Sequence, residues 1–369
     1  MSPSARPPEA GLASPSGVRP NPPATAEAPL LRVEGLQVHF PVASGVFQRR
    51  AVVRAVDGVD FEVRRGTTFG IVGESGSGKS TTALAVMRLV RHTGGRIFLG
   101  DDEIGALAGE PLRRARRRFQ MVFQDPYASL NPRKRAGDAI REALDLMDVG
   151  PPAGRAAHAE ALFLQTGLRP EQLQLFPHQF SGGQRQRIVL ARALAANPDL
   201  VVCDEPVSAL DVAIQAQMLN LMQRLQRDLR LTYLFISHDL GVVRHLCDEI
   251  AVMYLGRIVE QAPREPLFRQ PLHPYTVALW SAAPSFDPAL RGRGRRIRLV
   301  GDPPSPIDIP PGCRFAGRCP FAEDRCRAED PPLRTVASGH RVACHRVSDD
   351  GMPLYPIAAP VTEPVTAPG

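Results

Sequence analysis

The residues with the clearest chemical meaning lie in the segment GESGSGKST, residues 73–81. Its pattern is G-x-x-x-x-G-K-[ST], in which the backbone N–H groups of a glycine-rich loop surround phosphate oxygens. We expect the lysine to reach the outer phosphates, the hydroxyl after it to bind Mg²⁺, and the next helix to direct its N-terminus at the anion. The predicted nucleotide contacts are Gly73, Glu74, Ser75, Gly76, Ser77, Gly78, Lys79, Ser80 and Thr81.

The lysine of this segment stands out against the rest of the composition. Of the 45 basic residues, all are arginine except Lys79 and Lys134. Arginine is a planar, delocalised cation, whereas lysine offers a compact ammonium group on a flexible stem. A lysine kept at position 79 therefore indicates that a point charge of this kind is needed there.

A pair of acids ends the apolar run LVVCDEP, residues 200–206. Taken alone, the two acids could be solvated and idle at the end of a strand. Beside a phosphate-binding loop, we expect Asp204 to hold Mg²⁺, directly or through water. We expect Glu205 to orient and polarise the water that attacks the phosphate.

A second anion-binding helix terminus is predicted in FSGGQRQRIVLARAL, residues 180–194. Ser181 is a favourable N-cap, and Gly182 and Gly183 permit close approach of the backbone. Gln184 follows, and apolar residues with helical spacing continue the segment. Such a terminus offers free N–H groups and a positive dipole end to a phosphate.

The elements that must position these residues form an α/β pattern. Strands are expected at 30–40 and 67–73, and short apolar runs at 199–206 and 231–239 suit parallel strands that are buried on both faces. Helical spacing is found at 79–92 and 213–229. The order strand, glycine-rich loop, helix predicts a P-loop NTPase fold.

Composition limits the classes of protein that need to be considered. The sequence has 369 residues, 43% hydrophobic content and no apolar stretch near the length that crosses a bilayer. The start, MSPSARPPEA, lacks an apolar signal segment, which favours the cytosol. The net charge is +7, and we interpret the basic runs at 113–119 and 291–298 as solvated faces, so no nucleic acid partner is expected.

Changes of composition divide the chain into four parts. Residues 1–29 are rich in proline and alanine and are predicted to be a disordered tail. Residues 30–265 form the nucleotide domain. Residues 266–350, where proline is dense and periodicity is lost, form a small irregular extension that contains four cysteines, and residues 351–369 are predicted to be a second disordered tail.

The three motifs together resemble those of ATP-binding-cassette (ABC) proteins across residues 30–265. The resemblance implies roles for further positions. Gln124 in MVFQDP matches the glutamine that senses Mg²⁺ and contacts the membrane partner. Asp211 in SALD matches the D-loop residue at the dimer interface, and His238 in FISHD matches the histidine that touches the γ-phosphate. Ser181, Gly182, Gly183 and Gln184 become the signature segment, which binds ATP in trans.

An adenine-stacking aromatic is also implied by the resemblance. Phe40 stands where the family places it, although tyrosine is commoner there and Phe47 is a rival. The expected ligands of Mg²⁺ are Ser80, Gln124 and Asp204. In the family, two cassettes sandwich two ATP molecules head to tail, so the chain should need a second cassette and should hydrolyse ATP.

Two classes of ABC protein remain as alternatives. A soluble protein of DNA repair, chromosome structure or translation would carry a coiled-coil insertion or two cassettes in one chain, and this sequence has neither. The alternative, the ATPase of a membrane transporter, is therefore favoured. Local segments are similar to the oligopeptide/dipeptide permease ATPases: VFQDPYASLNPR (122–133), EPVSALDVAIQAQMLNLM (205–222), MYLGRIVE (253–260) and PLHPYTVALWSAAP (271–284).

This resemblance implies partners and a location. The longer loop between Phe40 and Ala55 favours the F-type ATPase subunit, which forms a heterodimer with a related D-type subunit. Two transmembrane permease subunits and an extracytoplasmic binding protein complete such an importer, with the ATPases on the cytoplasmic face of the inner membrane. Nickel and glutathione importers share the subfamily, so the sequence does not fix the cargo.

Four of the six cysteines lie in the extension, with the spacing C-x5-C-x6-C-x17-C. In the permease family this pattern is associated with an iron–sulfur cluster, which implies a [4Fe–4S] cluster held by Cys313, Cys319, Cys326 and Cys344. Zinc, with His340 or His345 as a further ligand, and no metal at all are the alternatives. The segment has few apolar residues, so a metal would supply the cross-links that a small module needs.

Overall fold

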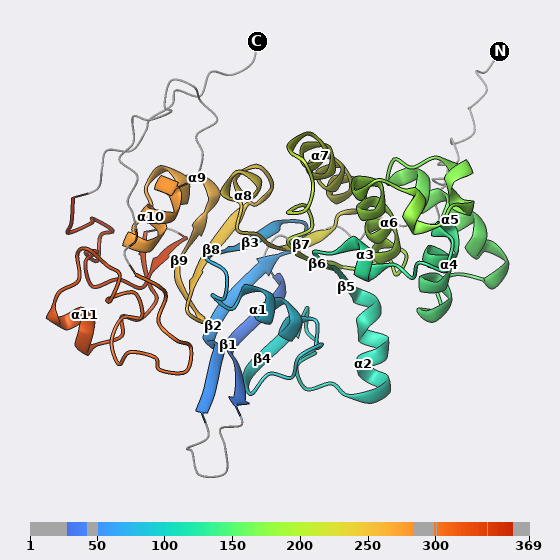
Figure 1. The fold of residues 1–369 in the computed structure, drawn as a ribbon. Helices are drawn as coiled ribbons and strands as arrows, with labels where there is room; N and C mark the ends of the chain where they lie inside the picture. Colours follow the sequence, from blue (N-terminus) through green and yellow to red (C-terminus); the bar gives the residue numbers. More distant parts are fainter. Residues whose placement is uncertain (1–27, 43–50, 283–298, 300, 338, 357–369) are drawn as a thin grey trace, which may run out of the picture.

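The computed structural model describes residues 28–42, 51–282, 299, 301–337 and 339–356 (Figure 1). The strands form a three-stranded sheet, β2-β1-β4, and an eight-stranded sheet, β10-β11-β9-β8-β3-β7-β6-β5. Their bounds are β1 Pro29–Val42, β2 Ala51–Arg64, β3 Thr68–Val72, β4 Gly94–Leu99, β5 Phe119–Val122, β6 Leu200–Asp204, β7 Thr232–Ile236, β8 Glu249–Tyr254, β9 Arg257–Pro263, β10 Arg334–Ala337 and β11 His340–Val342.

The larger sheet is parallel in its centre and buried on both faces. Strands β5, β6, β7, β3 and β8 pair in parallel. Alternate residues of each strand enter two different cores, as Val202 and Leu234 do on one face and Cys203 and Phe235 on the other. This burial confirms the interpretation of the apolar runs at 199–206 and 231–239.

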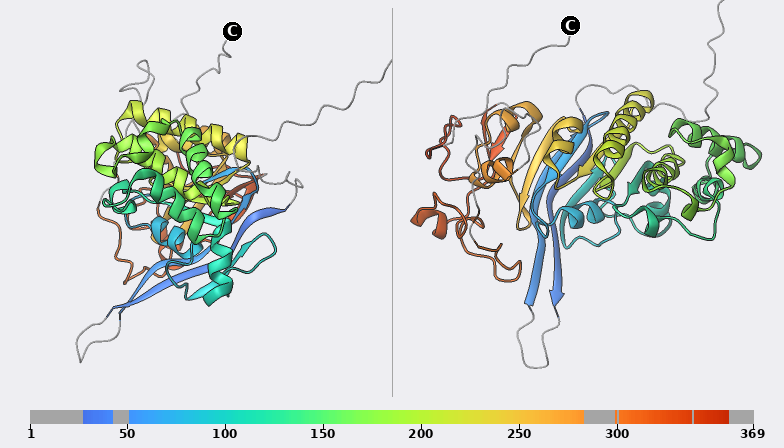
Figure 2. Two further views of the ribbon diagram at one scale, coloured as in Figure 1. Left: turned by 90° about the vertical axis from the view of Figure 1, so that its right-hand side faces the viewer. Right: turned by 45° about the horizontal axis from the view of Figure 1, so that its top comes forward.

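The helices cover this sheet, and α4, α5 and α6 continue past its edge at β5 (Figures 1 and 2). Helices α4 to α7 pack into the core that also receives Cys203 and Phe235, whereas α1 and the smaller sheet cover the opposite face. The bounds are α1 Lys79–Val86, α2 Gly109–Ala115, α3 Pro126–Ser129, α4 Ala136–Leu146, α5 Arg155–Gln165, α6 Gly182–Leu194, α7 Val212–Leu229, α8 Leu240–Leu246, α9 Arg264–Arg269, α10 Pro274–Ala282 and α11 Asp324–Ala328.

Two predicted helices had different outcomes. Helix α7 confirms the prediction over 213–229 almost to the residue. Helix α1 ends at Val86, six residues before the predicted end, and Arg88 has a φ of 54°. A left-handed residue cannot continue a right-handed helix, so the helix predicted over 79–92 is wrong beyond its second turn.

The extension continues the main sheet instead of forming a separate layer. Strand β11 pairs antiparallel with β9, and β10 pairs with β11 at the edge. Figure 1 shows this part, with α11, beside β8 and β9. The extension also has a small apolar cluster of its own, formed by Leu272, Val336, Val342, Cys344, Val347 and Tyr355. Only three members of this cluster, Val336, Val342 and Cys344, lie within residues 312–345, so the cysteine-containing segment shares its apolar contacts with the residues that flank it.

The predicted boundaries of the tails differ from the structure by a few residues. Pro29 already belongs to β1, and Tyr355 is buried in the small cluster of the extension, where its hydroxyl bonds to the carbonyl of Leu272. The remainder of the two predicted tails, residues 1–27 and 357–369, lies outside the described residues.

The basic run at 113–119 lies on the described surface around α2. Arg113 and Arg114 pair with Glu110, and Arg118 pairs with Asp102. These contacts agree with the interpretation of a solvated face. The second basic run, 291–298, lies outside the described residues.

Candidate active site

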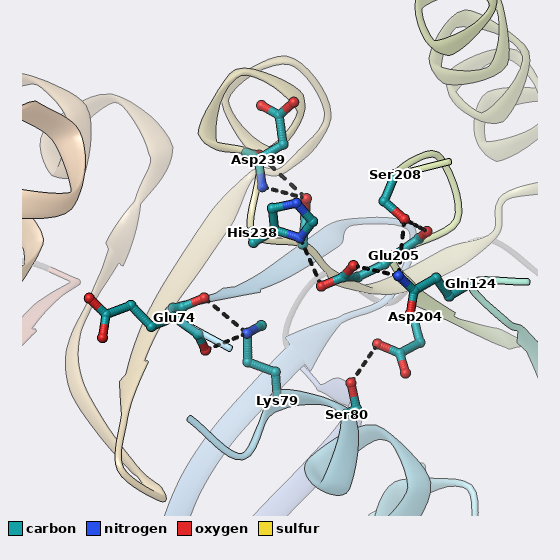
Figure 3. A network of polar contacts seen from close by, with 11 residues as sticks. Glu74, Lys79, Ser80, Gln124, Asp204, Glu205, Ser208, His238 and Asp239 are labelled. Atoms are coloured by element: carbon teal, nitrogen blue, oxygen red, sulfur yellow. Dashed lines mark hydrogen bonds and ion pairs between the residues drawn. The ribbon is translucent and has the colours of Figure 1, made fainter. Parts of the chain in front are cut away.

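The candidate residues converge because they follow the carboxyl ends of parallel strands. The phosphate loop follows β3, Gln124 follows β5, Glu205 follows β6 and His238 follows β7. The carboxyl ends of parallel strands meet at one edge of a sheet, where the crevice can receive a ligand. Figure 3 shows these side chains directed into one region.

The phosphate loop depends on glycine where the chain is crowded. Gly73 has a φ of 154°, and a Cβ there would lie 2.1 Å from the carbonyl oxygen of Met253. Gly78 has a φ of 106°, and a Cβ would lie 2.2 Å from the carbonyl oxygen of Ala55. Gly76 also has a positive φ, 77°, but faces open space. The loop therefore needs glycine for conformation at all three positions and for space at two of them.

Lys79 begins α1 and folds back over the loop. Its Nζ donates to the carbonyl oxygens of Gly73 at 2.9 Å and Glu74 at 2.8 Å (Figure 3). Burial lowers the pKa of this ammonium group, against the opposing effect of Glu205 and Asp204. If a phosphate took the place of the two carbonyl oxygens, the buried ammonium group would gain an oppositely charged partner.

Ser80 and Asp204 lie together at the start of α1 and the end of β6. The Ser80 hydroxyl donates to Asp204 Oδ1 at 3.0 Å. Burial raises the pKa of Asp204, and the neighbouring Glu205 adds to this, while Ser80 and Lys79 oppose it. A hydroxyl and a carboxylate are oxygen ligands of the kind that Mg²⁺ prefers, so the pair fits the predicted metal site.

Glu205 is the centre of the polar network. Its Oε1 lies 2.9 Å from His238 Nδ1, and its Oε2 accepts from Gln124 Nε2 at 3.1 Å. The backbone of Glu205 has a φ of 48°, which is uncommon for a residue other than glycine and typical of strained functional positions. Ser208, which sequence reasoning missed, donates to the Glu205 carbonyl oxygen at 3.0 Å and lies 3.4 Å from Gln124 Nε2.

The signature segment lies outside this network. Ser181 is the N-cap of α6, as predicted, and forms a capping box with Gln184 through bonds of 3.3 and 3.0 Å. A Cβ on Gly183 would lie 2.4 Å from Ile214 Cγ2. Asp211 caps α7 by accepting from the Ile214 N–H at 2.9 Å. Ser181 and Asp211 are both exposed, and neither is part of the network in Figure 3.

Phe40 lies near the end of β1, opposite Val53 of β2, and is 40% exposed. An exposed aromatic side chain can stack on a flat ligand, and the paired strand β2 carries Ala55, whose carbonyl oxygen lies beside Gly78 of the nucleotide loop. Its rival, Phe47, lies outside the described residues.

The four cysteines of the extension surround one small cavity. Cys313, Cys319, Cys326 and Cys344 line it together with His345 and Phe315, and all four are free thiols. Burial raises the pKa of Cys313 to about 11 and that of Cys344 to about 12. Nevertheless, in the described part of the chain no three His, Cys, Asp or Glu side chains are arranged as a metal site.

The two histidines that were considered as further metal ligands have different surroundings. His340 is buried and bonds to Glu260 at 2.8 Å, away from the thiols. His345 lines the thiol cavity, and its Nε2 lies 3.1 Å from the Glu329 carbonyl oxygen.

Sequence reasoning missed the contacts between the extension and the phosphate loop. Arg318 pairs with Glu74, and the Glu74 N–H donates to the hydroxyl of Tyr275. The cysteine spacing singles out Cys313 and Cys319 but carries no signal for Arg318 between them. Tyr275 stands in the segment PLHPYTVALWSAAP, which indicates the family but not this contact. Contacts across more than 200 residues leave no local periodic signal.

Two family models match the chain. The model of the ABC transporter family covers residues 56–208, and the model of the oligopeptide/dipeptide transporter C-terminal region covers residues 259–326. The first range contains the phosphate loop, the signature segment and Glu205. The second contains Tyr275, Cys313, Cys319 and Cys326.

Curated relatives are similar over most of the chain. A probable peptide ABC transporter ATP-binding protein of Sinorhizobium fredii, y4tS, is 51% identical and covers 86% of this chain and 89% of its own length. The oligopeptide transport ATP-binding protein AppF of Bacillus subtilis is 48% identical, covering 86% and 98%. The di/tripeptide transport ATP-binding protein DppF of Pseudomonas aeruginosa is 47% identical, covering 86% and 97%.

Solved structures support the fold of the cassette. The ATP-binding cassette MJ0796, solved as a dimer in a post-hydrolysis state with ADP and phosphate, is 25% identical with a TM-score of 0.57 and covers 63% of this chain and 98% of its own. CbiO1 of Clostridium perfringens is 24% identical with a TM-score of 0.56, covering 66% and 91%.

Fold and site together define an ABC-type ATPase with the P-loop NTPase architecture. The chain belongs to the family of ATP-binding subunits of ABC transporters, in the group that carries the oligopeptide/dipeptide transporter C-terminal region. Its hydrolysis of ATP is coupled to transport. None of the helices in the described ranges is both long and apolar enough to cross a bilayer.

Proposed function

We propose that this chain hydrolyses ATP to energise the import of dipeptides and oligopeptides. The observation that carries the proposal is the meeting of Lys79, Ser80, Asp204, Glu205 and His238 at one edge of the sheet, in a chain whose relatives are named as peptide transport ATP-binding proteins. The extension supports the peptide cargo, because it matches the oligopeptide/dipeptide transporter model.

The partners follow from this function. The chain is inferred to pair with a related ATPase subunit as a heterodimer and to drive two permease subunits that receive cargo from an extracytoplasmic binding protein. It would lie at the cytoplasmic face of the inner membrane as a peripheral subunit. Gln124 and the exposed Tyr127 beside it, 64% exposed, are on the surface where a permease segment would contact the catalytic network.

The chemical step assigns a role to each side chain. Backbone N–H groups of residues 73–81 and the N-terminus of α1 bind the phosphates, and the Lys79 ammonium turns from the carbonyl oxygens of Gly73 and Glu74 to the outer phosphates. Ser80, Gln124 and Asp204 would hold Mg²⁺, which neutralises charge on the β- and γ-phosphates. Phe40 would stack on the adenine.

Glu205 and His238 act on the water and the γ-phosphate. The Glu205 carboxylate orients the attacking water in line with the γ-phosphate. His238, 2.9 Å from Glu205, fixes the carboxylate and lies ready to donate to a γ-phosphate oxygen. Gln124 donates to the second carboxylate oxygen of Glu205. A shift of Gln124 at the end of β5 would therefore change the orientation of the Glu205 carboxylate.

The signature segment completes the site of a second subunit. Ser181 is exposed at the N-terminus of α6, where its hydroxyl and the positive end of the helix would face a γ-phosphate held by a second subunit. Asp211, exposed at the N-terminus of α7, would lie at the same interface. ATP would thus join two cassettes, and loss of phosphate would separate them.

Uptake by cells with and without the gene tests the cargo. A labelled dipeptide and labelled Ni²⁺ are compared side by side, with labelled glutathione as a third cargo. Loss of dipeptide uptake alone is expected. Loss of nickel or glutathione uptake alone would overturn the peptide cargo and keep the motor role. A soluble function outside transport would be indicated if the purified chain hydrolysed ATP but its deletion left all three uptakes intact.

We further infer that Cys313, Cys319, Cys326 and Cys344 hold a [4Fe–4S] cluster, with zinc as the alternative. Four thiols around one cavity are the donor set that such a cluster needs, and it would cross-link three segments of the extension. The space between the thiols, about 10 Å³, has room for about one water, so a cluster would require these segments to move apart. Iron and acid-labile sulfide in protein purified without oxygen are expected. Zinc alone, or no metal, would overturn this assignment.

A further inference from the structure

Glu74, the second residue of the phosphate loop, is held at three points. Lys79 bonds to its carbonyl oxygen at 2.8 Å. The hydroxyl of Tyr275 accepts from its backbone N–H at 2.8 Å. The guanidinium of Arg318 donates to both oxygens of its carboxylate, at 2.7 and 3.1 Å. Two of these three contacts come from the C-terminal extension.

The pair between Glu74 and Arg318 is shielded from solvent. The side chain of Arg318 is 8% exposed and that of Glu74 is 28% exposed. The pair is bidentate, which fixes the orientation of both planar groups. In Figure 3 the Glu74 carboxylate points away from Lys79, so this side chain faces the extension while the backbone of the same residue borders the lysine. The Glu74 carboxylate can therefore bind Arg318 without competing with phosphate for Lys79.

An aromatic cluster holds the extension against the loop. The ring of Tyr275 lies 4.7 Å from that of Tyr254 in β8 and 5.4 Å from that of Phe315. The ring of Phe315 in turn lies 5.3 Å from that of Tyr254, in an edge-to-face arrangement. All three residues are buried, so the hydroxyl of Tyr275 and the chain that carries Arg318 are fixed relative to the sheet.

The same short segment contacts a second part of the cassette. Arg314, four residues before Arg318, bonds to the carboxylate of Asp57 in β2 and to the carbonyl oxygen of Leu255. Asp57 also bonds to His39, the neighbour of Phe40, at 2.9 Å. The segment between Cys313 and Cys319 therefore contacts both β2, the strand paired with the one that carries Phe40, and the loop that is predicted to bind the phosphates.

We propose that Arg318 and Tyr275 are positioning residues for ATP, through which the C-terminal extension fixes the phosphate loop. The proposal rests on the assignment of residues 73–81 as the nucleotide site. Without the two contacts, the Glu74 peptide can rotate, and the N–H groups that follow it lose the orientation that phosphate binding requires. The extension then acts on the affinity for ATP and not on the hydrolysing groups Glu205 and His238.

Affinity for a non-hydrolysable ATP analogue with Mg²⁺, titrated into the full-length chain, tests this proposal. Arg318→Ala is expected to raise the dissociation constant about tenfold, the loss typical of a hydrogen-bonded ion pair shielded from solvent. Tyr275→Phe, which removes one hydroxyl and keeps the ring, is expected to raise it several-fold. Arg325→Ala is the matched control, because Arg325 lies in the same extension but pairs with Glu329 at the surface, with both side chains more than half exposed.

Two further measurements separate positioning from general stability. Glu74→Ala combined with Arg318→Ala should bind no more weakly than either single variant, and exchange of the two charges, Glu74→Arg with Arg318→Glu, should recover part of the affinity. In the assembled transporter, Arg318→Ala should raise KM for ATP and leave kcat nearly unchanged. A variant that lost only stability would show additive losses and no rescue.

The outcomes distinguish this proposal from the assignment of the nucleotide site. Loss of binding in Lys79→Ala with wild-type affinity in Arg318→Ala and Tyr275→Phe would overturn the role of the extension alone. Wild-type affinity in Lys79→Ala as well would overturn the nucleotide site. If Arg318→Ala does not fold, Tyr275→Phe decides, because it keeps the buried ring and removes only the contact to Glu74.

Discussion

Glu205 Oε1 lies 2.9 Å from Nδ1 of His238, although the two residues follow different strands. Glu205 directly follows β6 and His238 is the second residue after β7, and these two parallel strands are neighbours in the sheet. Strand pairing, and not the local sequence, therefore places the candidate base Glu205 beside His238, the residue that is expected to contact the γ-phosphate.

Replacement of Glu205 by glutamine should abolish hydrolysis and keep ATP binding. The amide keeps the size and hydrogen-bonding shape of the side chain but cannot accept a proton from water. We expect kcat to fall by a factor on the order of 10²–10⁴. With ATP bound and not cleaved, the pair of cassettes should remain closed, which size-exclusion chromatography in the presence of ATP can detect.

The control for this variant is Glu249→Gln, a half-buried glutamate at the start of β8, at the opposite end of the sheet from the nucleotide site. It should hydrolyse ATP at the wild-type rate. Normal turnover by Glu205→Gln would reject the assignment of Glu205 as the base.

Replacement of Lys79 by alanine should weaken nucleotide binding itself. The ammonium group is buried and bonded to the backbone of the loop. The one other lysine of the sequence is Lys134. Loss of a buried positive charge at a triphosphate should raise the dissociation constant for ATP by at least about tenfold. Equilibrium titration with ATP and Mg²⁺ measures this.

Lys134 supplies a matched control for that experiment. It is 41% exposed and pairs with Glu142, away from the loop. Lys134→Ala should bind ATP as the wild type does. Equal losses in the two variants would mean that position 79 has no special role.

Much of the site could be predicted because its motifs are local. The phosphate loop, the two acids at the end of β6 and the cap of α6 are each contained in a segment of about ten residues, where turn chemistry and strand composition act. The early end of α1 was missed because Arg88 adopts a left-handed conformation that no periodic pattern reveals. The contacts of Arg318 and Tyr275 with Glu74 were missed because they join segments more than 200 residues apart.

Gly73 should be less tolerant of a side chain than Gly76, although both belong to the phosphate loop. Gly73→Ala places a Cβ 2.1 Å from the carbonyl oxygen of Met253, so the backbone must shift. We expect a loss of about 2–3 kcal/mol in the free energy of unfolding, typical of overpacking in a tight core. Gly76→Ala meets no atom within 4 Å and should cost about 1–2 kcal/mol, because only its positive φ is disfavoured.

Chemical denaturation of both variants, together with ATP affinity, checks this order. Gly73→Ala should also bind ATP more weakly, since the shift displaces the start of the loop. An unfolding midpoint for Gly76→Ala below that of Gly73→Ala would contradict the structure of the loop.

Asp57 should link the stability of the extension to pH. Burial alone would raise the pKa of this carboxyl, but hydrogen bonds from Arg314 and His39 outweigh it, and the net pKa lies below the ordinary value of 3.8. A folded-state pKa that is lowered contributes stability at every pH above about 3.8, and this contribution is lost as the pH falls below it. Asp57→Ala leaves the buried charge of Arg314 without its partner and should cost about 3 kcal/mol at pH 7.

The pH dependence distinguishes this charge effect from a packing defect. The difference in unfolding free energy between wild type and Asp57→Ala should be constant from pH 7 to about pH 5 and should shrink below pH 3.8, because the wild type then loses the ionised carboxylate. Glu62→Ala, at an exposed position of the same strand, is the control and should have little effect at any pH. A difference that persisted unchanged at pH 3 would show that Asp57 acts through its volume, because protonation would then leave its contribution intact.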